Sequence, residues 1–174
     1  SVVDATIMNL TIKDPEIVMN CIDMGALVGY SYGTSTYKNI TIDGGVVANY
    51  NRYTGGVVGE VNGTQTFENV DVIDTKISAL WGTYDCACGG IIGGKWGDAT
   101  VIMKDCDVTA ELDVFNDACA NYQYYLYRRC GMLIGNSEEV TDGTATASYL
   151  TATNCNVTYG DWANYTYCES EAYG

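Results

Sequence analysis

Eight cysteines and five Asn-x-Thr sequons are the residues in this 174-residue sequence whose types and spacing could support chemistry. The sequence contains no histidine, which excludes Ser-His-Asp and Cys-His catalytic arrangements and weakens the usual zinc sites. Disulfide formation in an oxidising compartment is therefore the better interpretation of the cysteines. The sequons favour the same secreted or cell-surface setting, with N-linked glycans expected at Asn9, Asn39, Asn62, Asn156 and Asn164.

Charge excludes several other classes of function. The net charge of −14 repels phosphate backbones, so we expect no nucleic-acid partner, and no apolar run approaches the length that would insert into a membrane. Four carboxylates (Asp71, Asp74, Asp105 and Asp107) could cluster outward as in polysaccharide-degrading enzymes, but solvation or weak calcium binding explains them more simply. We therefore expect no enzyme activity, catalytic residue, metal or cofactor.

The elements that position these residues follow from an internal repeat. A motif of glycines around apolar residues recurs at 25–29, 55–59, 89–93 and 131–135. A second motif follows each copy and reads Asn or Asp, apolar, polar, apolar, as in Asn39-Ile40-Thr41-Ile42. Repeats of this length predict stacked supersecondary units with loops inserted between them.

Superposing the second motifs gives two columns of predicted core residues. The first column is Leu10, Ile40, Val70, Cys106 and Cys155, and the second is Ile12, Ile42, Val72, Val108 and Val157. Period-two alternation after the Asn or Asp predicts a strand with one buried face, and the residue itself predicts a bend, because Asn and Asp tolerate left-handed backbone angles. No segment holds a helical stripe.

These patterns predict an all-β, right-handed parallel β-helix (β-solenoid) of about five coils, forming one domain over 1–174. Within it we expect an irregular first coil at 1–24, which holds the single proline, Pro15. A tyrosine-rich insertion is expected at 110–129, a polar insertion at 137–148 and a C-terminal tail at 159–174. The chain is interpreted as a mature form or an excised piece of a secreted protein.

The glycine motif and the strand after it resemble the GLUG-motif repeats of secreted and surface-attached proteins. The resemblance covers mainly residues 25–158, with Ala26 and Met132 in place of the usual first glycine. It implies a right-handed parallel β-solenoid and often an adhesive role. The family shares no catalytic residues, so the resemblance implies none here.

The same superposition suggests which cysteines lie together. Cys88 aligns with Cys130, where a bridge is favoured, and Cys106 aligns with Cys155, where a bridge and two packed thiols remain equal alternatives. A pair of Cys86 with Cys119 would hold down the tyrosine-rich insertion. Cys21 and Cys168 fall in the first and last coils, so either the tail folds back, each cysteine bonds another molecule, or the pairing is different.

The tyrosine-rich run is the clearest binding feature of the sequence. Tyrosine and arginine are typical interface anchors, and planar rings stack on sugars, although an aromatic cover over the coil is an equal alternative. The candidate interface or glycan-binding residues are Tyr122, Tyr124, Tyr125, Tyr127, Arg128 and Arg129.

Open strand edges at the ends of a solenoid favour addition of a second copy. The first hypothesis is therefore a secreted, glycosylated structural protein that assembles head to tail with itself into an extracellular filament. The second is a carbohydrate-binding or adhesin module whose partner is an extracellular polysaccharide.

Overall fold

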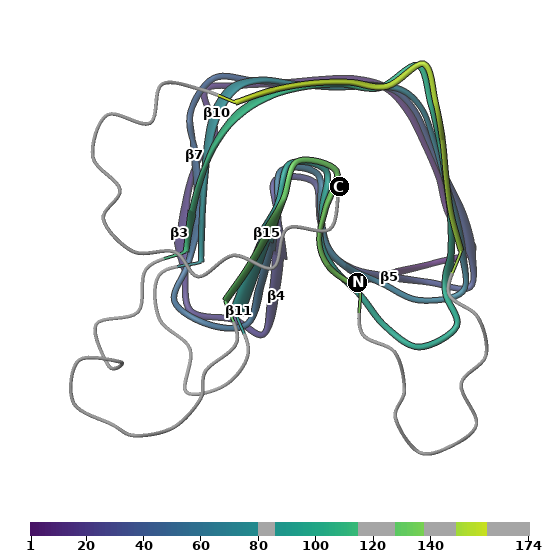
Figure 1. Ribbon diagram of the computed structural model, residues 1–174, viewed down its shortest axis with the longest axis horizontal. Coiled ribbons are helices and arrows are strands. Elements are labelled where there is room, and N and C mark those ends of the chain that lie inside the picture. Colours follow the sequence, from purple (N-terminus) through teal and green to yellow (C-terminus); the bar gives the residue numbers. More distant parts are fainter. Residues whose placement is uncertain (80–85, 115–127, 138–148, 160–174) are drawn as a thin grey trace.

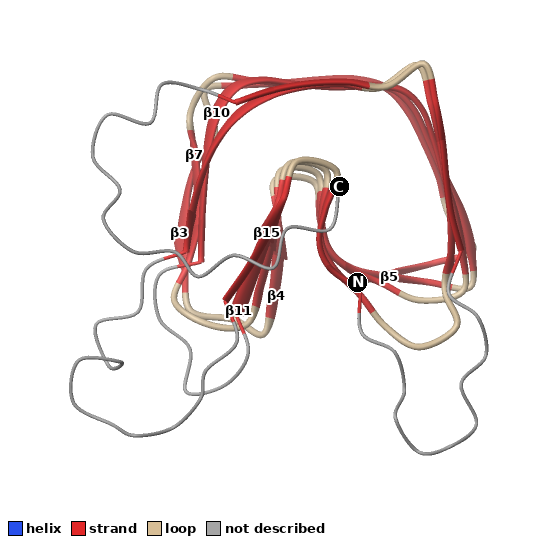
Figure 2. Cartoon of the chain, in the orientation of Figure 1, coloured by secondary structure: helices blue, strands red, loops and turns tan. Residues whose placement is uncertain are grey.

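The computed structural model describes residues 1–79, 86–114, 128–137 and 149–159. All regular elements in these ranges are β-strands, and the strands pair in parallel, as the repeat pattern predicted (Figure 2). In the same ranges, no helix is long and apolar enough to cross a bilayer. The arrangement is compatible with a parallel β-helix.

Three sheets contain these strands. The nine-stranded sheet comprises β2 (Thr6–Lys13), β3 (Glu16–Met19), β6 (Thr34–Asp43), β7 (Val46–Asn49), β10 (Thr64–Ala79), β13 (Thr100–Lys104), β14 (Asp107–Val114), β17 (Tyr149–Thr153) and β18 (Asn156–Tyr159). The five-stranded sheet is β1 (Val2–Val3), β5 (Val28–Tyr32), β9 (Val58–Val61), β12 (Ile92–Lys95) and β16 (Ile134–Ser137). The four-stranded sheet is β4 (Asp23–Gly25), β8 (Tyr53–Gly55), β11 (Cys86–Gly89) and β15 (Arg128–Gly131).

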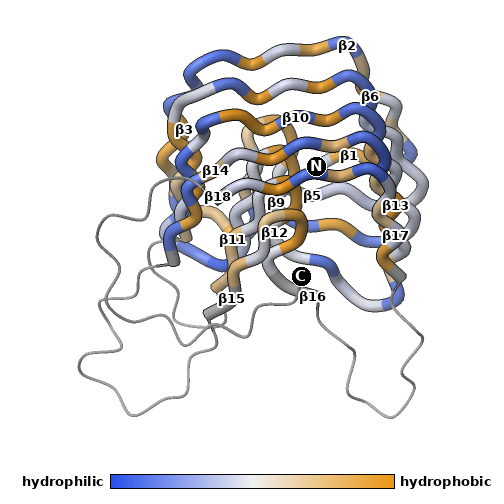
Figure 3. The backbone as a smooth tube through the Cα atoms, turned by 45° about the horizontal axis from the view of Figure 1, so that its top comes forward, coloured by the Kyte–Doolittle hydropathy of each residue, from blue (hydrophilic) through white to orange (hydrophobic). Residues whose placement is uncertain are grey.

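The register of the nine-stranded sheet confirms the alignment of the repeats. Leu10 pairs with Ile40 and Ile40 with Val70, while Val72 pairs with Val108 and Val108 with Val157. Like residues therefore form columns from one layer of strands to the next, and hydropathy alternates along each layer (Figure 3). Stacking of like residues fixes the register, because a slip of one residue would turn every apolar side chain outward.

The predicted bend at the Asn or Asp is also confirmed. Asn9, Asn39, Asn69, Asp105 and Asn154 all have positive φ, between 53° and 60°. In β10 this residue resets the alternation, so that Phe67 and Val70 both point inward although three positions separate them. A left-handed residue inside a strand thus turns the chain while its apolar side chains stay on one side.

The glycine motifs take a position that the sequence analysis did not predict. The nine-stranded sheet runs around the outside, and the other two sheets form two arms that meet inside it at the glycine turns (Figure 1). Val57 and Val58 occupy one such turn and are fully buried. The motif therefore folds into the interior and fills it with apolar side chains.

Glycine is required where the two arms touch. A Cβ on Gly55 would lie 1.9 Å from the carbonyl oxygen of Val58, and one on Gly59 would lie 2.3 Å from the backbone nitrogen of Met24. Both contacts are with backbone atoms, which cannot move aside without breaking strand pairing. The spacing of the glycines thus reflects the close approach of two backbones, with β9 lying against both β4 and β8.

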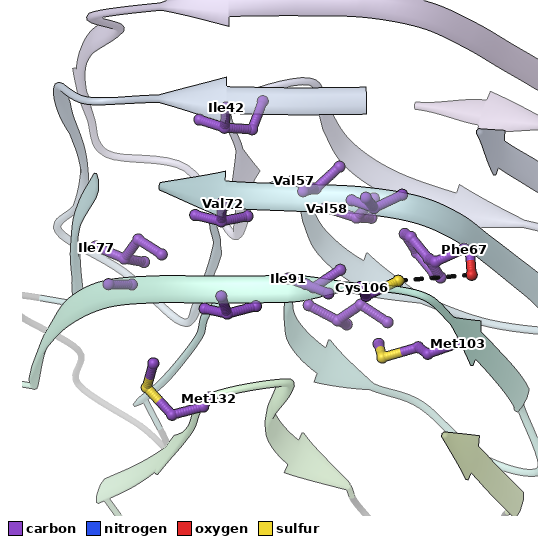
Figure 4. Packing of buried hydrophobic residues seen from close by; sticks show 14 of the residues in the cluster. Ile42, Val57, Val58, Phe67, Val72, Ile77, Ile91, Met103, Cys106 and Met132 are labelled. Carbon is purple, nitrogen blue, oxygen red and sulfur yellow. Dashed lines mark hydrogen bonds between the residues drawn. The ribbon is translucent and has the colours of Figure 1, made fainter. Parts of the chain in front are cut away.

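The core lies between the outer sheet and the glycine turns (Figure 4). Ile42 and Val72 from the outer sheet are in one cluster with Val57, Val58 and Ile91 from the turns. In the neighbouring columns, the rings of Tyr37 and Phe67 stack with centroids 4.7 Å apart and an interplanar angle of 9°. Such stacks bind one layer to the next as well as filling the core.

Strands extend into ranges where the sequence suggested irregular chain. β2, β3 and β4 of segment 1–24 pair in register with β6, β7 and β8. β14 continues to Val114 and β15 starts at Arg128, so paired strand enters both ends of 110–129. The remainder of that insertion, most of 137–148 and the tail after Tyr159 lie outside the described residues.

Candidate functional site

A ladder of side-chain amides runs along the corner formed by the bend residues. Asn39 Nδ2 donates to Asn9 Oδ1 at 2.8 Å, Asn69 Nδ2 donates to Asn39 Oδ1 at 3.0 Å, and Asn154 Nδ2 donates to Asp105 Oδ1 at 3.1 Å. Each donor belongs to the later layer and each acceptor to the earlier one. The bonds all run in one direction along the stack, and the ladder is interrupted between Asn69 and Asp105, because a carboxylate has no hydrogen to donate to Asn69 Oδ1.

This polarity leaves complementary groups at the two ends of the ladder. Within the described residues, Asn9 Nδ2 in the first layer donates to no partner, and Asn154 Oδ1 in the last layer accepts from none. A parallel column with the same direction ends at Asn156, whose Nδ2 donates to Asp107 Oδ1 at 2.8 Å. One edge of the stack thus offers an amide donor and the other an amide acceptor.

The inward columns are open at the same two edges. Leu10 is 37% exposed, whereas Ile40 in the next layer of its column is 0% exposed. At the other edge Leu150 and Val157 are each 46% exposed, whereas Val101, which pairs with Leu150, is 0% exposed. The core columns are therefore fully buried in the middle layers and partly exposed to solvent in the first and last layers. A further parallel layer would cover them.

Charges on the outer face also pair between layers. Lys38 Nζ lies 2.9 Å from Glu68 Oε1, and Lys76 Nζ lies 3.2 Å from Glu111 Oε1. These pairs are exposed, so each contributes little to stability and mainly favours the observed register. Burial raises the pKa of Asp71, and the charge of Asp107 in the next layer raises it further.

The expected glycosylation sites are spread over the stack. Asn9, Asn39 and Asn156 are exposed, and Asn62 is partly exposed at the end of β9, whereas Asn164 lies outside the described residues. A glycan on Asn39 would use the nitrogen that now donates to Asn9, so glycosylation there competes with the ladder.

The cysteine columns lie where the repeat alignment put them. Cys88 pairs in register with Cys130, and their Sγ atoms are 3.5 Å apart as free thiols. The Cys106 thiol lies 3.4 Å from the Lys104 carbonyl oxygen, and burial, the main cause, raises its pKa to about 11. Cys155 is also free and follows in the same column, and Cys21 lies 3.5 Å from the Asp23 carbonyl oxygen. Cys86 is buried, whereas Cys119 and Cys168 lie outside the described residues.

Oxidation is expected to join Cys88 to Cys130, because only a small movement separates their sulfur atoms. Burial raises the pKa of the Cys88 thiol well above its usual value, so the reaction at neutral pH is expected to be slow. Peptide mapping without reductant after exposure to oxidised glutathione should recover a Cys88–Cys130 cross-link. Recovery of both cysteines as alkylated thiols, with another pair oxidised, would contradict the expectation.

The tyrosine-rich candidates cannot be assembled into a site here. Tyr122, Tyr124, Tyr125 and Tyr127 lie outside the described residues, and only the backbone of Arg128 and Arg129 is described, in β15. The described residues also contain no group of three or more His, Cys, Asp or Glu side chains arranged to hold a metal ion. Asp71 and Asp107 are neighbours in register, and Asp105 stands on the amide ladder.

Sequence reasoning missed one pocket, of about 290 Å³, lined by Asp23, Tyr30, Arg52, Glu60, Asn62 and Trp96. Asp23, Tyr30 and Glu60 lie in β4, β5 and β9, and Arg52, Asn62 and Trp96 lie directly beside the ends of β8, β9 and β12, so both arms contribute. They occupy columns whose residue type changes from layer to layer: Tyr30 pairs with Glu60, and Glu60 with Gly94. This change of residue type within a repeating column is the sequence feature that could have indicated the pocket.

Comparison with models of known protein families, with curated proteins and with solved structures found no match to this chain.

Proposed function

We propose that this chain is a secreted, glycosylated structural protein whose copies add head to tail into an extracellular filament. In this proposal the three parallel sheets are faces of a right-handed parallel β-helix of about five coils, related to the GLUG-repeat proteins that the glycine motif resembles. The last layer of one copy pairs with the first layer of the next. The filament is then one continuous stack.

The observation that carries the proposal is the polar amide ladder. With copies stacked in register and Asn9 free of a glycan, Asn9 Nδ2 of one copy would face Asn154 Oδ1 of the preceding copy, which continues the pattern seen between Asn39 and Asn9. A self-complementary pair of edges is what a heterologous, open-ended assembly needs.

Apolar burial supports the same contact. Stacking would bring Leu10 above Cys155 and Ile12 above Val157, which continues the two core columns. Full burial of a wholly exposed side chain of this kind is worth about 1.5–3 kcal/mol, and stacking would gain the part of this that remains for Leu10 and Val157, which are 37% and 46% exposed. Stacking would also provide hydrogen-bond partners for the backbone N–H and C=O groups on the open sides of β2, β17 and β18. Without such partners, these groups could pair with strands of other chains.

A charge placed on the open edge tests the proposal. Leu10→Lys is expected to abolish filaments, because a lysine in the core column cannot be buried between two layers. The matched control is Thr6→Lys, which adds the same charge to the outward face of the same strand, lies in no sequon and should leave assembly intact. Sedimentation velocity and negative-stain electron microscopy over a concentration series measure the outcome.

Thermal unfolding of both variants at low concentration shows whether the monomer is still folded. Leu10 is already partly exposed, so we expect little change in the melting temperature. If wild-type protein remains a dispersed monomer at every concentration, or if Leu10→Lys assembles as well as wild type, head-to-tail stacking is wrong.

A further inference from the structure

We propose that the pocket between the two arms binds a neutral sugar residue of a glycan chain. The pocket is distinct from the open edges of the stack, so it can serve a filament or a single copy equally. Its volume of about 290 Å³ lies at the lower end of the range for small-molecule sites. A site of this size holds a ring rather than a large cofactor.

The first support is a carboxyl pair on facing walls. Asp23 lies at the start of β4, Glu60 lies in β9, and their side chains are hydrogen-bonded to each other. Such a bond requires one proton between two carboxyl groups. Burial is the main cause that raises the pKa of Asp23, and the hydrogen bond with Glu60 and the nearby charge of Arg52 partly oppose that rise.

The pocket is therefore close to electrically neutral inside a strongly acidic chain. One shared proton leaves the Asp23–Glu60 pair with a single negative charge, and the positive charge of Arg52 balances it. Arg52 also occupies the position that a cationic ligand would need, because its guanidinium carbon lies 5.1 Å from the centre of the Trp96 ring. Ligands with a net charge of either sign are thus disfavoured, and neutral hydroxyl groups are favoured.

The second support is the aromatic wall. Trp96 is 40% exposed beside the polar groups of the pocket, and Tyr30 lines it from β5. Pyranose rings combine an apolar C–H face with a rim of hydroxyl groups, so they match a site that has an indole next to carboxyl, amide and guanidinium groups. Asn62 supplies the amide.

The aromatic wall extends beyond the pocket along β5. Tyr32 stacks on Tyr30 with ring centroids 5.7 Å apart and is itself exposed. Tyr32 lies in β5 and Trp96 directly follows β12, which are the second and fourth strands of the five-stranded sheet, so about two strand spacings, roughly 10 Å, separate their backbones. An oligosaccharide lying along the arm can contact both, which favours a polymer over a free monosaccharide.

Calorimetric titration with three neutral hexasaccharides, from cellulose, mannan and chitin, tests this inference. At least one is expected to bind, and Trp96→Ala should weaken that binding about tenfold or more, as removal of an aromatic anchor does. Tyr50→Ala is the matched control, because Tyr50 is an exposed aromatic residue that does not line the pocket.

Asn62 stands in a sequon, and a glycan on it would occupy the pocket mouth. The titrations are therefore repeated on Thr64→Ala, which removes the sequon and leaves Asn62 in place. Absence of binding to all three neutral probes in this background would overturn the inference. Equal binding by Trp96→Ala, or preference for a hexagalacturonate over every neutral probe, would overturn it too, and neither outcome bears on filament formation.

Discussion

Gly55→Ala is expected to lower the free energy of unfolding by about 3 kcal/mol or more, or to prevent folding. The added methyl carbon would lie 1.9 Å from the Val58 carbonyl oxygen, 2.7 Å from the Gly93 nitrogen and 2.8 Å from the Ile91 carbonyl oxygen. All three are backbone atoms of paired arms, so relief of the overlap must separate the strands of two layers. Urea unfolding followed by circular dichroism measures the loss.

Gly29→Ala is the comparison within the same motif. A methyl carbon there meets one atom closer than 3.0 Å, the Asp23 carbonyl oxygen at 2.8 Å. We expect a clearly smaller loss than for Gly55→Ala, since a shift of a few tenths of an ångström at a single contact relieves it. Equal losses at the two glycines would mean that close approach of the arms is not what the motif serves.

Phe67→Ala is expected to cost about 3–5 kcal/mol of stability, as for other large side chains removed from a packed core. Phe67 is fully buried, stacks on Tyr37 and has its backbone carbonyl oxygen 3.7 Å from the Cys106 sulfur. Its loss leaves a cavity that reaches three neighbouring layers. The rigid outer strands prevent collapse around the gap.

The adjacent residue provides the control for Phe67. Glu68 points outward and pairs with Lys38 at 2.9 Å, so Glu68→Ala should cost less than about 1 kcal/mol. Chemical denaturation of both variants gives the comparison. Similar losses from these neighbours would contradict the alternation of buried and exposed side chains in β10.

The architecture was predictable because the repeats carry it redundantly. Each copy of the second motif has the same bend residue, Asn or Asp, followed by the same two inward-facing apolar positions. Only one register between neighbouring layers buries all of these apolar residues. The repeat alignment alone therefore places Ile40, Val70 and Cys106 in one column, and Asn39 and Asn69 adopt the left-handed conformation expected of them.

The inward glycine turns and the pocket were not predictable in the same way. The sequence does not show which backbone a glycine contacts. Gly59, for example, lies against β4 of the preceding repeat. The pocket unites Asp23, Arg52, Glu60 and Trp96 from three repeats at positions where the pattern changes. Superposition of repeats emphasises what is constant, whereas a binding site depends on side chains that occur once.

Helical reconstruction by cryo-electron microscopy of the concentrated protein tests the central claim most directly. The account predicts a continuous parallel stack in which Asn9 of each copy lies one strand spacing, about 4.8 Å, from Asn154 of the copy before it. Particles that remain single, or filaments whose copies touch through the outer face while β2 stays open, would contradict it.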